Sequence, residues 1–549
     1  MSFGVSCQSR GFVVRAMGLR TENMNEEHVM ESLQTWKRVT WMGKIIGFLF
    51  AMGFAGFCVC YVSLLHSFHG GYSPIHYGMV AQELKGFAHE VTINGSSEKS
   101  VVEAGQEEEY LDSYLDLVSG SSMPGNKNYS TDLQHIVFGI GASALLWETR
   151  KEYVKLWWKP KEMRGFVWLD KPINGMKEWE FCLPAWRISG NTSEFKYTHK
   201  HGWRSSIRLS RIVAETFRQG LPDVHWFVMG DDDTVFVPQN LVTVLSKYDH
   251  TQFYYIGGNS ESHIQNQFFS FNMAFGGGGF AISYPLARAL ESMQDKCLTR
   301  YHHLFGSDDR VQACVVELGV PLTREPGFHQ LDIIGKAWGL LAAHPIAPLV
   351  SLHHMEVLEP LFSGRSRVES VRHILQAASF DPAALLQQSI CYDRRRRWSI
   401  SVSWGYIVQI MRGLVSPRDL ERPLRTFSNW QNRDDFMSYP FNTRPFPTHP
   451  CDKPLLFELH NISHSRHSHS IVMSEYRRRD EEQISNCSKR IASPHRVETI
   501  RVFKRRDDYL WFKEPRRNCC TLRHRKRKSK IIDMEVAPCK DGEIITMFL

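Results

Sequence analysis

The sequence predicts an α/β fold in which strands and helices alternate along the chain. Apolar runs of strand length alternate with segments of helical periodicity between residues 135 and 256. The chain has 549 residues, 42% of them hydrophobic and 12% aromatic, which is enough to bury a sizeable core. No period of 20–50 residues is present, so repeat architectures are excluded. The alternation favours a parallel or mixed sheet with right-handed crossovers.

The elements follow from these patterns. Apolar runs predict strands at 135–140, 165–170, 224–229 and 253–256. Apolar residues at helical spacing predict helices over 144–158, 203–219 and 238–246. Ligands of such sheets lie at the carboxyl ends of the strands. We therefore expect the chemistry just after residues 140, 169 and 229.

An uncharged run from Ile45 to Leu65 predicts a transmembrane helix. A helix of this length spans about 31 Å, close to the hydrocarbon core of a bilayer. Lys37, Arg38 and Lys44 precede it, so the positive-inside rule places the N-terminus in the cytosol and the rest of the chain in a lumen. The alternatives are a cleaved signal peptide, whose apolar core is shorter, and a buried core helix.

Cysteines and glycosylation motifs agree with a lumenal body. Acceptor motifs N-x-S/T occur at Asn94, Asn128, Asn191, Asn461 and Asn486. Nine of the 12 cysteines lie beyond the apolar run, and in an oxidising lumen most should form disulfides. Because nine is odd, at least one of them is expected to stay outside these pairs. No C-x-x-C pair occurs, which argues against a zinc ribbon.

The positive charge is local. The net charge is +8, yet residues 477–530 hold 19 Lys and Arg against seven Asp and Glu, a net of +12 that leaves −4 for the rest. The body is therefore not a nucleic-acid binder on charge grounds. We expect residues 471–549 to form a basic, flexible tail. The Gly-, Ser- and acid-rich residues 66–132 predict a stem.

Three aspartates follow the strand predicted at 224–229. Adjacent carboxylates repel one another unless a cation lies among them. In an extended segment alternate side chains point the same way, so Asp231 and Asp233 can face one pocket, with Asp232 between them. Carboxylate oxygens suit Mg²⁺ or Mn²⁺, ions that bridge diphosphates. The alternative is an exposed acidic turn.

Three later segments complete a candidate site. The glycine run 276–279 allows a close approach of the backbone to a ligand, or is a flexible loop. Asp308 and Asp309 open a predicted helix, where they are either an acidic site or a plain cap. His353 and His354 end a short apolar run, as a metal ligand or as structural histidines.

The strand followed by Asp-Asp-Asp-Thr-Val-Phe resembles the D-x-D motif of GT-A nucleotide-sugar glycosyltransferases. The ordered set of four segments resembles the fringe-like β1,3-glycosyltransferases, in particular their plant-type branch, over about residues 133–460. The resemblance implies a GT-A, Rossmann-like fold and transfer of a sugar from a UDP-sugar to an acceptor hydroxyl with inversion. It implies Mn²⁺, or Mg²⁺, as the cofactor.

The resemblance also implies residue roles. It makes Asp309, paired with Asp308, the catalytic base, and Asp231, Asp233 and His354 the metal ligands, with His353 as the alternative one residue away. It implies nucleotide-sugar contacts for Gly141, Ser143, Asp170, Asp231 and Asp232, acceptor-side glycines at Gly277, Gly278 and Gly279, and a disulfide between Cys297 and Cys314. The residues after the first strand lack the Lys, Thr or Arg of animal fringes, so the donor sugar stays open.

The predicted organisation is a cytosolic tail 1–44, an anchor 45–65, a stem 66–132, a catalytic domain 133–355, an extension 356–470 and a tail 471–549. Within the extension, strict alternation over 398–404 predicts a strand with one buried face. Type II topology and the resemblance imply a Golgi membrane protein that acts on a glycan or glycoprotein, alone or as a homo- or hetero-oligomer, without nucleic acid. The alternatives are a non-catalytic lumenal protein that binds glycans or assists another transferase, and a membrane-tethered nucleic-acid factor.

Overall fold

The computed structural model describes residues 131–546, except for 174–179, 433–434, 466–467, 480–486, 488–489, 508–509, 513–514 and 524–528. The predicted cytosolic tail and membrane anchor lie outside the described residues, as does nearly all of the stem. Within the described part, no helix combines the length and the apolar character needed to span a bilayer.

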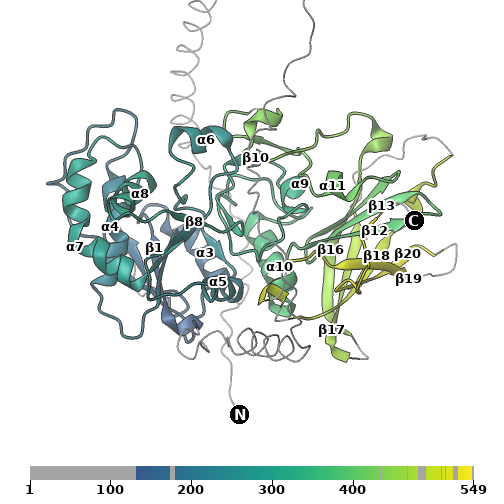
Figure 1. Ribbon diagram of the computed structural model, residues 1–549, viewed down its shortest axis with the longest axis horizontal. Coiled ribbons are helices and arrows are strands. Elements are labelled where there is room, and N and C mark those ends of the chain that lie inside the picture. The colour runs from purple at the N-terminus through teal and green to yellow at the C-terminus, as the bar shows by residue number, and fades with distance from the viewer. Residues whose placement is uncertain are drawn as a thin grey trace, which may run out of the picture. The chain divides into compact units, whose positions relative to one another are not determined.

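The first half is built on a seven-stranded mixed sheet of order β3-β2-β1-β4-β7-β6-β8 (Figure 1). Its strands are β1 (Ile136–Gly141), β2 (Arg164–Leu169), β3 (Ala185–Ile188), β4 (Trp226–Asp231), β6 (Tyr255–Gly257), β7 (Phe280–Ser283) and β8 (Leu322–Arg324). The four strands from β3 to β4 are parallel, whereas β7 is antiparallel to both its neighbours. The predicted α/β class is confirmed.

Helices cover both faces of this sheet. Ile136, Phe138 and Ile140 pack in one core cluster, against α3 (Trp147–Trp157) and α5 (Pro238–Leu245). Val137 packs in the other, against α4 (Ser205–Phe217), α7 (Tyr284–Arg300) and α8 (Asp308–Glu317). Burial on both faces explains why β1 is apolar throughout rather than alternating.

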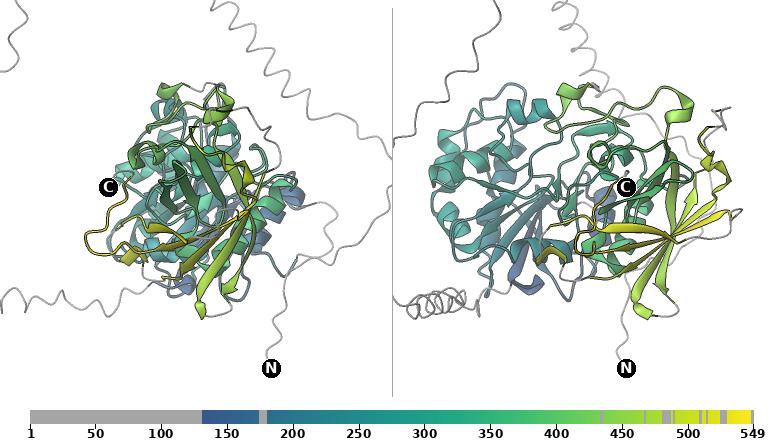
Figure 2. Two further views of the ribbon diagram at one scale, coloured as in Figure 1. Left: turned by 90° about the vertical axis from the view of Figure 1, so that its right-hand side faces the viewer. Right: turned by 45° about the vertical axis from the view of Figure 1, so that its right-hand side comes forward.

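The second half is a closed barrel of order β12-β13-β14-β16-β17-β18-β20-β19 (Figure 2). Its strands are β12 (Gln388–Asp393), β13 (Trp398–Ser403), β14 (Ile407–Arg412), β16 (Leu455–Ser465), β17 (Ser468–Arg478), β18 (Thr499–Arg505), β19 (Cys519–Arg523) and β20 (Ile531–Ala537). Strand β13 was expected to bury one face, but all six of its residues are buried.

The expectation of a flexible tail at 471–549 is wrong for the described residues, because β18, β19, β20 and most of β17 lie there. The charge of the segment conceals an alternation of period two. In β18, Ile500, Val502 and Lys504 are buried, whereas the residues between them are partly exposed. Arg501 and Arg505 occupy outer positions of the strand, whereas Lys504 faces the interior.

Short elements connect the two halves. The sheet order β5-β11-β9 joins β5 (Val235–Phe236), β11 (Ser351–Leu352) and β9 (Phe328–His329), and a separate ladder pairs β10 (Ile333–Gly335) with β15 (Phe427–Asn429). The remaining helices are α6 (His263–Phe268), α9 (Trp338–Leu341), α10 (Arg367–Phe380) and α11 (Pro417–Leu420). One core cluster extends from β1 through α10 into the barrel strands.

Four disulfides join eight of the nine cysteines beyond residue 65: Cys297–Cys314, Cys391–Cys520, Cys451–Cys487 and Cys519–Cys539. The predicted Cys297–Cys314 bond is present and ties α7 to α8. The ninth cysteine, Cys182, is buried outside these four bonds, in agreement with the odd count.

Candidate active site

The acidic triplet lies where the sheet order predicts a ligand site, at the carboxyl end of β4. Asp231 ends the strand opposite Gly141 of β1, and the chain then turns tightly into β5. The Thr234 hydroxyl accepts a hydrogen bond from the Asp231 amide and donates one to the Gly277 carbonyl, both at 2.8 Å. One side chain thus fixes the turn and holds the glycine run against it.

A histidine joins the aspartates, and it is His353. Its Nε2 atom lies 3.2 Å from Asp233 Oδ1 and 3.8 Å from Asp231 Oδ2. One ligand atom from each of Asp231, Asp233 and His353 lies within 4.8 Å of the other two. The structure brings these three residues together as a group that could hold a metal ion.

His354, favoured as the ligand by the resemblance, lies outside the group formed by Asp231, Asp233 and His353, whereas His353, the alternative, lies within it. Its backbone has φ 52°, in the left-handed region, which turns the chain directly after His353. Its Nδ1 atom lies 3.3 Å from an Asp332 oxygen, and its ring packs edge-on against Trp430 at 4.9 Å. His354 therefore contacts the ladder of β10 and β15 rather than the acidic triplet.

Arg150 on α3 is a site residue that the sequence analysis missed. Its guanidinium lies 2.9 Å from Asp232 Oδ1 and 3.5 Å from Asp233 Oδ2, and it also contacts Glu356. Burial opposes its charge, but Asp233 and the other carboxylates outweigh burial and raise its pKa. No motif pointed to it, since it is one basic residue in a charged amphipathic helix.

The carboxylates of the triplet differ in proton affinity. Burial raises the pKa of Asp231 to about 7 and that of Asp232 to about 6, although His353 and Arg150 respectively oppose these shifts. For Asp233 the contact with His353 outweighs burial, so its pKa lies below the usual range. Burial would lower the pKa of His353, but Asp233 raises it to about 9.

The residues present fit a hard divalent cation. Both oxygens of Asp233 and Oδ2 of Asp232 are buried without a well-formed hydrogen bond from the described chain. The charges of Arg150 and His353 offset part of the cost of burying these carboxylates, and a bound cation would offset more of it. Two carboxylates and one imidazole form a ligand set that Mn²⁺ or Mg²⁺ accepts.

The glycine run packs against the side chains of the site. The Gly276 amide donates a hydrogen bond to Asp308 Oδ2 at 2.9 Å. A Cβ atom at Gly277 would lie 2.1–2.5 Å from three atoms of the His353 ring, and Gly279 has φ 82°. Gly278 approaches the backbone of Gln330 closely. The nearest neighbours of Gly276 and Gly277 are thus Asp308 and His353, respectively.

The two acids of α8 face different spaces. Asp308 lines a small cleft with Asp231 and Gly141. The Asp309 carboxylate accepts hydrogen bonds from the amides of Phe305 at 2.9 Å and Gly306 at 3.0 Å. It lines a second cavity of about 450 Å³ that is walled by aromatic side chains and His199. Burial raises the pKa of both acids.

The predicted nucleotide-sugar residues are only partly brought together. Gly141 borders the cleft at Asp231, and the Ser143 amide hydrogen-bonds to Asp232, which lowers the pKa of that carboxyl. Asp170 is exposed at the end of β2, where its Oδ1 accepts a hydrogen bond from the Ala144 amide at 2.7 Å. Asp170 thus fixes the turn after β1.

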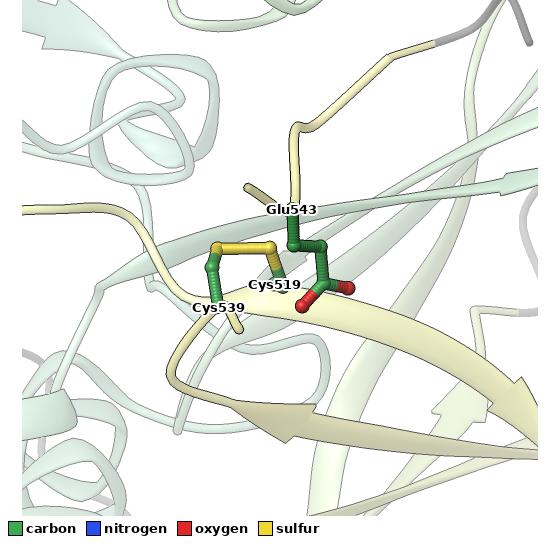
Figure 3. Close-up of side chains that lie close together, drawn as sticks. All are labelled: Cys519, Cys539 and Glu543. Atoms are coloured by element: carbon green, nitrogen blue, oxygen red, sulfur yellow. A yellow bond between two sulfur atoms is a disulfide. The ribbon is translucent and has the colours of Figure 1, made fainter. Parts of the chain in front are cut away.

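A second group of acid and sulfur atoms lies in the barrel. Cys519, Cys539 and Glu543 are close enough to suggest a metal site. Figure 3 shows, however, that the two sulfurs are bonded to each other, so the thiolates that a metal would need are absent. The Glu543 carboxylate accepts a hydrogen bond from the Lys540 amide at 2.8 Å. The group is a structural disulfide beside a turn.

Comparison with known proteins gives two family matches. The Fringe-like family matches residues 133–343, and a family described as a protein of unknown function, DUF604, matches residues 265–520. No curated protein matches the chain.

Two solved structures are slightly similar. A glycosyltransferase involved in the glycosylation of the major capsid of PBCV-1 has 12% identity and a TM-score of 0.23, covering 44% of this chain and 98% of its own. The mannosyltransferase PcManGT from Pyrobaculum calidifontis, in complex with GDP-Man and Mn²⁺, has 13% identity and a TM-score of 0.20. The match covers 49% of this chain and 82% of that one. Our assignment does not depend on either likeness. Residues 133–343 are similar to the Fringe-like family, and this similarity supports a glycosyltransferase.

Proposed function

We propose that this protein is a metal-dependent glycosyltransferase of the plant-type fringe-related branch. It transfers a sugar from a UDP-sugar to an acceptor hydroxyl with inversion, forming a β1,3-type linkage. The observation that carries the proposal is the convergence of Asp231, Asp233 and His353 at the end of β4, in a segment similar to the Fringe-like family.

Asp231, Asp233 and His353 would hold Mn²⁺ or Mg²⁺. The bound ion supplies Lewis-acid chemistry that neutralises the charge of a leaving diphosphate. Arg150 adds a permanent positive charge beside Asp232 and Asp233. Its charge persists near neutral pH because a guanidinium does not titrate there, so it pairs with these carboxylates whenever they are ionised.

Asp309 is the proposed base. A bond forms between the acceptor oxygen and the anomeric carbon while the bond from that carbon to the diphosphate oxygen breaks, and the hydroxyl proton passes to Asp309. The cavity of about 450 Å³ beside this carboxylate falls within the size range of small-molecule sites. Burial raises the pKa of Asp309 and so makes it a stronger base than an exposed aspartate.

The proposal also covers the cellular location and the membrane topology of the enzyme. It is a single-pass type II protein of the Golgi membrane with a lumenal catalytic domain, acting on a glycan or glycoprotein. Four disulfides support an oxidising compartment. Its oligomeric state is left open between homo- and hetero-oligomer.

The proposal is tested by UDP release from the purified full chain with a panel of UDP-sugars, with and without glycan acceptors. We expect release that requires Mn²⁺, stops with a chelator and is lost in Asp233→Asn. Asp452→Asn, an exposed aspartate of the barrel half, is the control and should retain release. If no UDP-sugar binds in the presence of Mn²⁺, the protein is a non-catalytic relative.

Two pairs of variants test the roles. His353→Ala should lose Mn²⁺ affinity, measured by calorimetry, while His354→Ala retains it; the reverse result would restore His354 as the ligand. Asp309→Asn should abolish transfer and keep Mn²⁺–UDP binding. If Asp308→Asn abolishes transfer and Asp309→Asn does not, the base is Asp308.

A further inference from the structure

A further cavity of the described chain lies away from the acidic triplet. It has a volume of about 490 Å³ and opens between the ladder of β10 and β15 and barrel strand β16. This volume falls within the range of roughly 300–1,000 Å³ that is usual for small-molecule sites. Neither the motifs of the sequence nor the proposed transfer accounts for it.

Three cationic side chains line this cavity: Lys336, Arg425 and Arg479. No acidic residue of the described chain lines it. Two carboxylates lie behind the cations, Glu359 at 3.8 Å from Lys336 and Glu458 at 3.6 Å from Arg479. Both contacts are ion pairs, whereas no carboxylate of the described residues forms an ion pair with Arg425, the third cation. The cavity is therefore suited to an anion.

Arg425 retains donor capacity. One of its terminal nitrogens donates a hydrogen bond to Thr443 Oγ1 at 3.2 Å. Its Nε atom is buried without a hydrogen-bond partner in the described chain. A guanidinium offers two parallel donors to a planar carboxylate, and such paired hydrogen bonds are stronger and more directional than contacts to a point charge.

The other walls suit a sugar ring. Trp338 and Phe446 meet edge to face with their ring centroids 6.3 Å apart, and Phe446 is 38% exposed. Aromatic faces pack against the C–H faces of pyranose rings, which are apolar. The hydroxyl groups of Thr426 and Ser428 also line the cavity. Inorganic phosphate would use the cations alone and leave the aromatic walls exposed to water.

The cavity and the residues that contact His354 lie along one ladder. Ile333 pairs with Asn429 at one end, next to Asp332 and Trp430, the residues that contact His354. At the other end the Lys336 amide donates to the Thr426 carbonyl at 3.2 Å. Asp332 and Lys336 are four residues apart along the chain, so they are separated by at most about 13 Å. A short oligosaccharide can extend over that distance.

From these observations we propose that the cavity lined by Lys336, Arg425, Arg479, Trp338 and Phe446 binds a carboxylate-bearing sugar unit of an acidic glycan. The carboxylate pairs with Arg425 and Lys336, and the ring packs on the aromatic side chains. Binding itself is independent of transfer, whereas a role in holding the acceptor rests on the proposed function.

The test measures binding to the full chain by calorimetry, with chelator and without nucleotide sugar. The probes are a uronic-acid oligosaccharide, its carboxyl-reduced neutral counterpart, a sulfated oligosaccharide of the same backbone and inorganic phosphate. We expect the uronate to bind at least about tenfold more tightly than the neutral form. Equal binding of the neutral form, or equal competition by the sulfated form or phosphate, would overturn the carboxylate assignment.

Variants locate the binding. Lys336→Gln and Phe446→Ala alter partly exposed side chains and should leave the fold intact, yet each should weaken uronate binding at least about tenfold. Lys530→Gln, an exposed cation of the barrel, is the control. Asp233→Asn should retain uronate binding even though it loses transfer, which separates the two proposals. Unchanged affinity in Lys336→Gln and Phe446→Ala would place the ligand elsewhere.

Discussion

Lys504→Met tests whether the basic C-terminal segment is an integral part of the fold. Lys504 on β18 forms an ion pair of 2.7 Å with Asp381, which follows α10, and their side chains are 3% and 0% exposed. Removing one partner of a buried pair leaves the other charge uncompensated and costs about 3–5 kcal/mol of the free energy of unfolding. We expect a loss of this size in Lys504→Met.

The pH dependence of that loss follows from Asp381. Burial raises the pKa of Asp381, and Lys504 opposes the rise. Without Lys504 the pKa in the folded state rises further above that of the unfolded chain. A group with a raised folded pKa contributes stability at low pH and loses it as the pH increases. The deficit of Lys504→Met should therefore be larger at pH 8 than at pH 5.

Urea denaturation of the purified full chain, followed by circular dichroism, measures the loss. The control is Lys530→Met, which breaks an ion pair with Glu498 whose side chains are 68% and 50% exposed. Exposed pairs contribute about 0–1 kcal/mol. The double variant Lys504→Met with Asp381→Leu should recover most of the stability. If Lys504→Met and Lys530→Met differ by less than about 0.5 kcal/mol, β18 does not pack on the rest of the chain as described.

Three further predictions concern the site. Gly277→Ala should displace His353 and lower Mn²⁺ affinity at least about tenfold by calorimetry, because its new methyl group overlaps the ring; unchanged affinity would show that the loop yields freely. Replacing Cys297 and Cys314 by Ser should lower the free energy of unfolding, measured by urea denaturation, by about 3 kcal/mol, because the disulfide closes a loop of 17 residues and so reduces the entropy of the unfolded chain. A loss under about 1 kcal/mol would contradict this. Mn²⁺ affinity should fall by up to about tenfold per pH unit from pH 9 to pH 7, where protons compete at His353, whose pKa is raised to about 9, and by up to about a hundredfold per unit below pH 7, where they also compete at Asp231, whose pKa is raised to about 7; a pH-independent affinity would argue against ligation by these groups.

The sequence was most informative where local pattern and burial agree. β1 and β4 are apolar runs because the sheet is covered on both faces, so their residue ranges were predictable to within two residues. The choice between His353 and His354 was not predictable from the sequence. It depends on the left-handed backbone at His354, which no pattern of residue types encodes. Arg150 was missed for a related reason: only the packing of α3 brings it to the triplet.

The barrel was under-predicted because its polar residues are buried. The serines of β13 indicated a solvent face, yet Ser399 donates a hydrogen bond to the Gly413 carbonyl at 2.9 Å, and Ser403 is also buried beside backbone carbonyls. Small hydroxyl side chains can form hydrogen bonds with neighbouring backbone groups, so they can be buried. In β18 the buried positions are Ile500, Val502 and Lys504, and the total charge alone suggested a solvated segment.

The barrel half also bears on the candidate active site. Trp430 packs on His354, directly after β15, and β15 pairs with β10, whose preceding residue Asp332 contacts the same ring. Truncation after residue 355 would remove Trp430 and β15 and expose the core cluster shared by β1, α10 and the barrel. His354 follows His353 directly in the chain. The contacts that Trp430 and Asp332 make with His354 therefore also affect the position of His353, the candidate ligand. The segment matched as DUF604, residues 265–520, therefore includes structure on which the fringe-like segment depends.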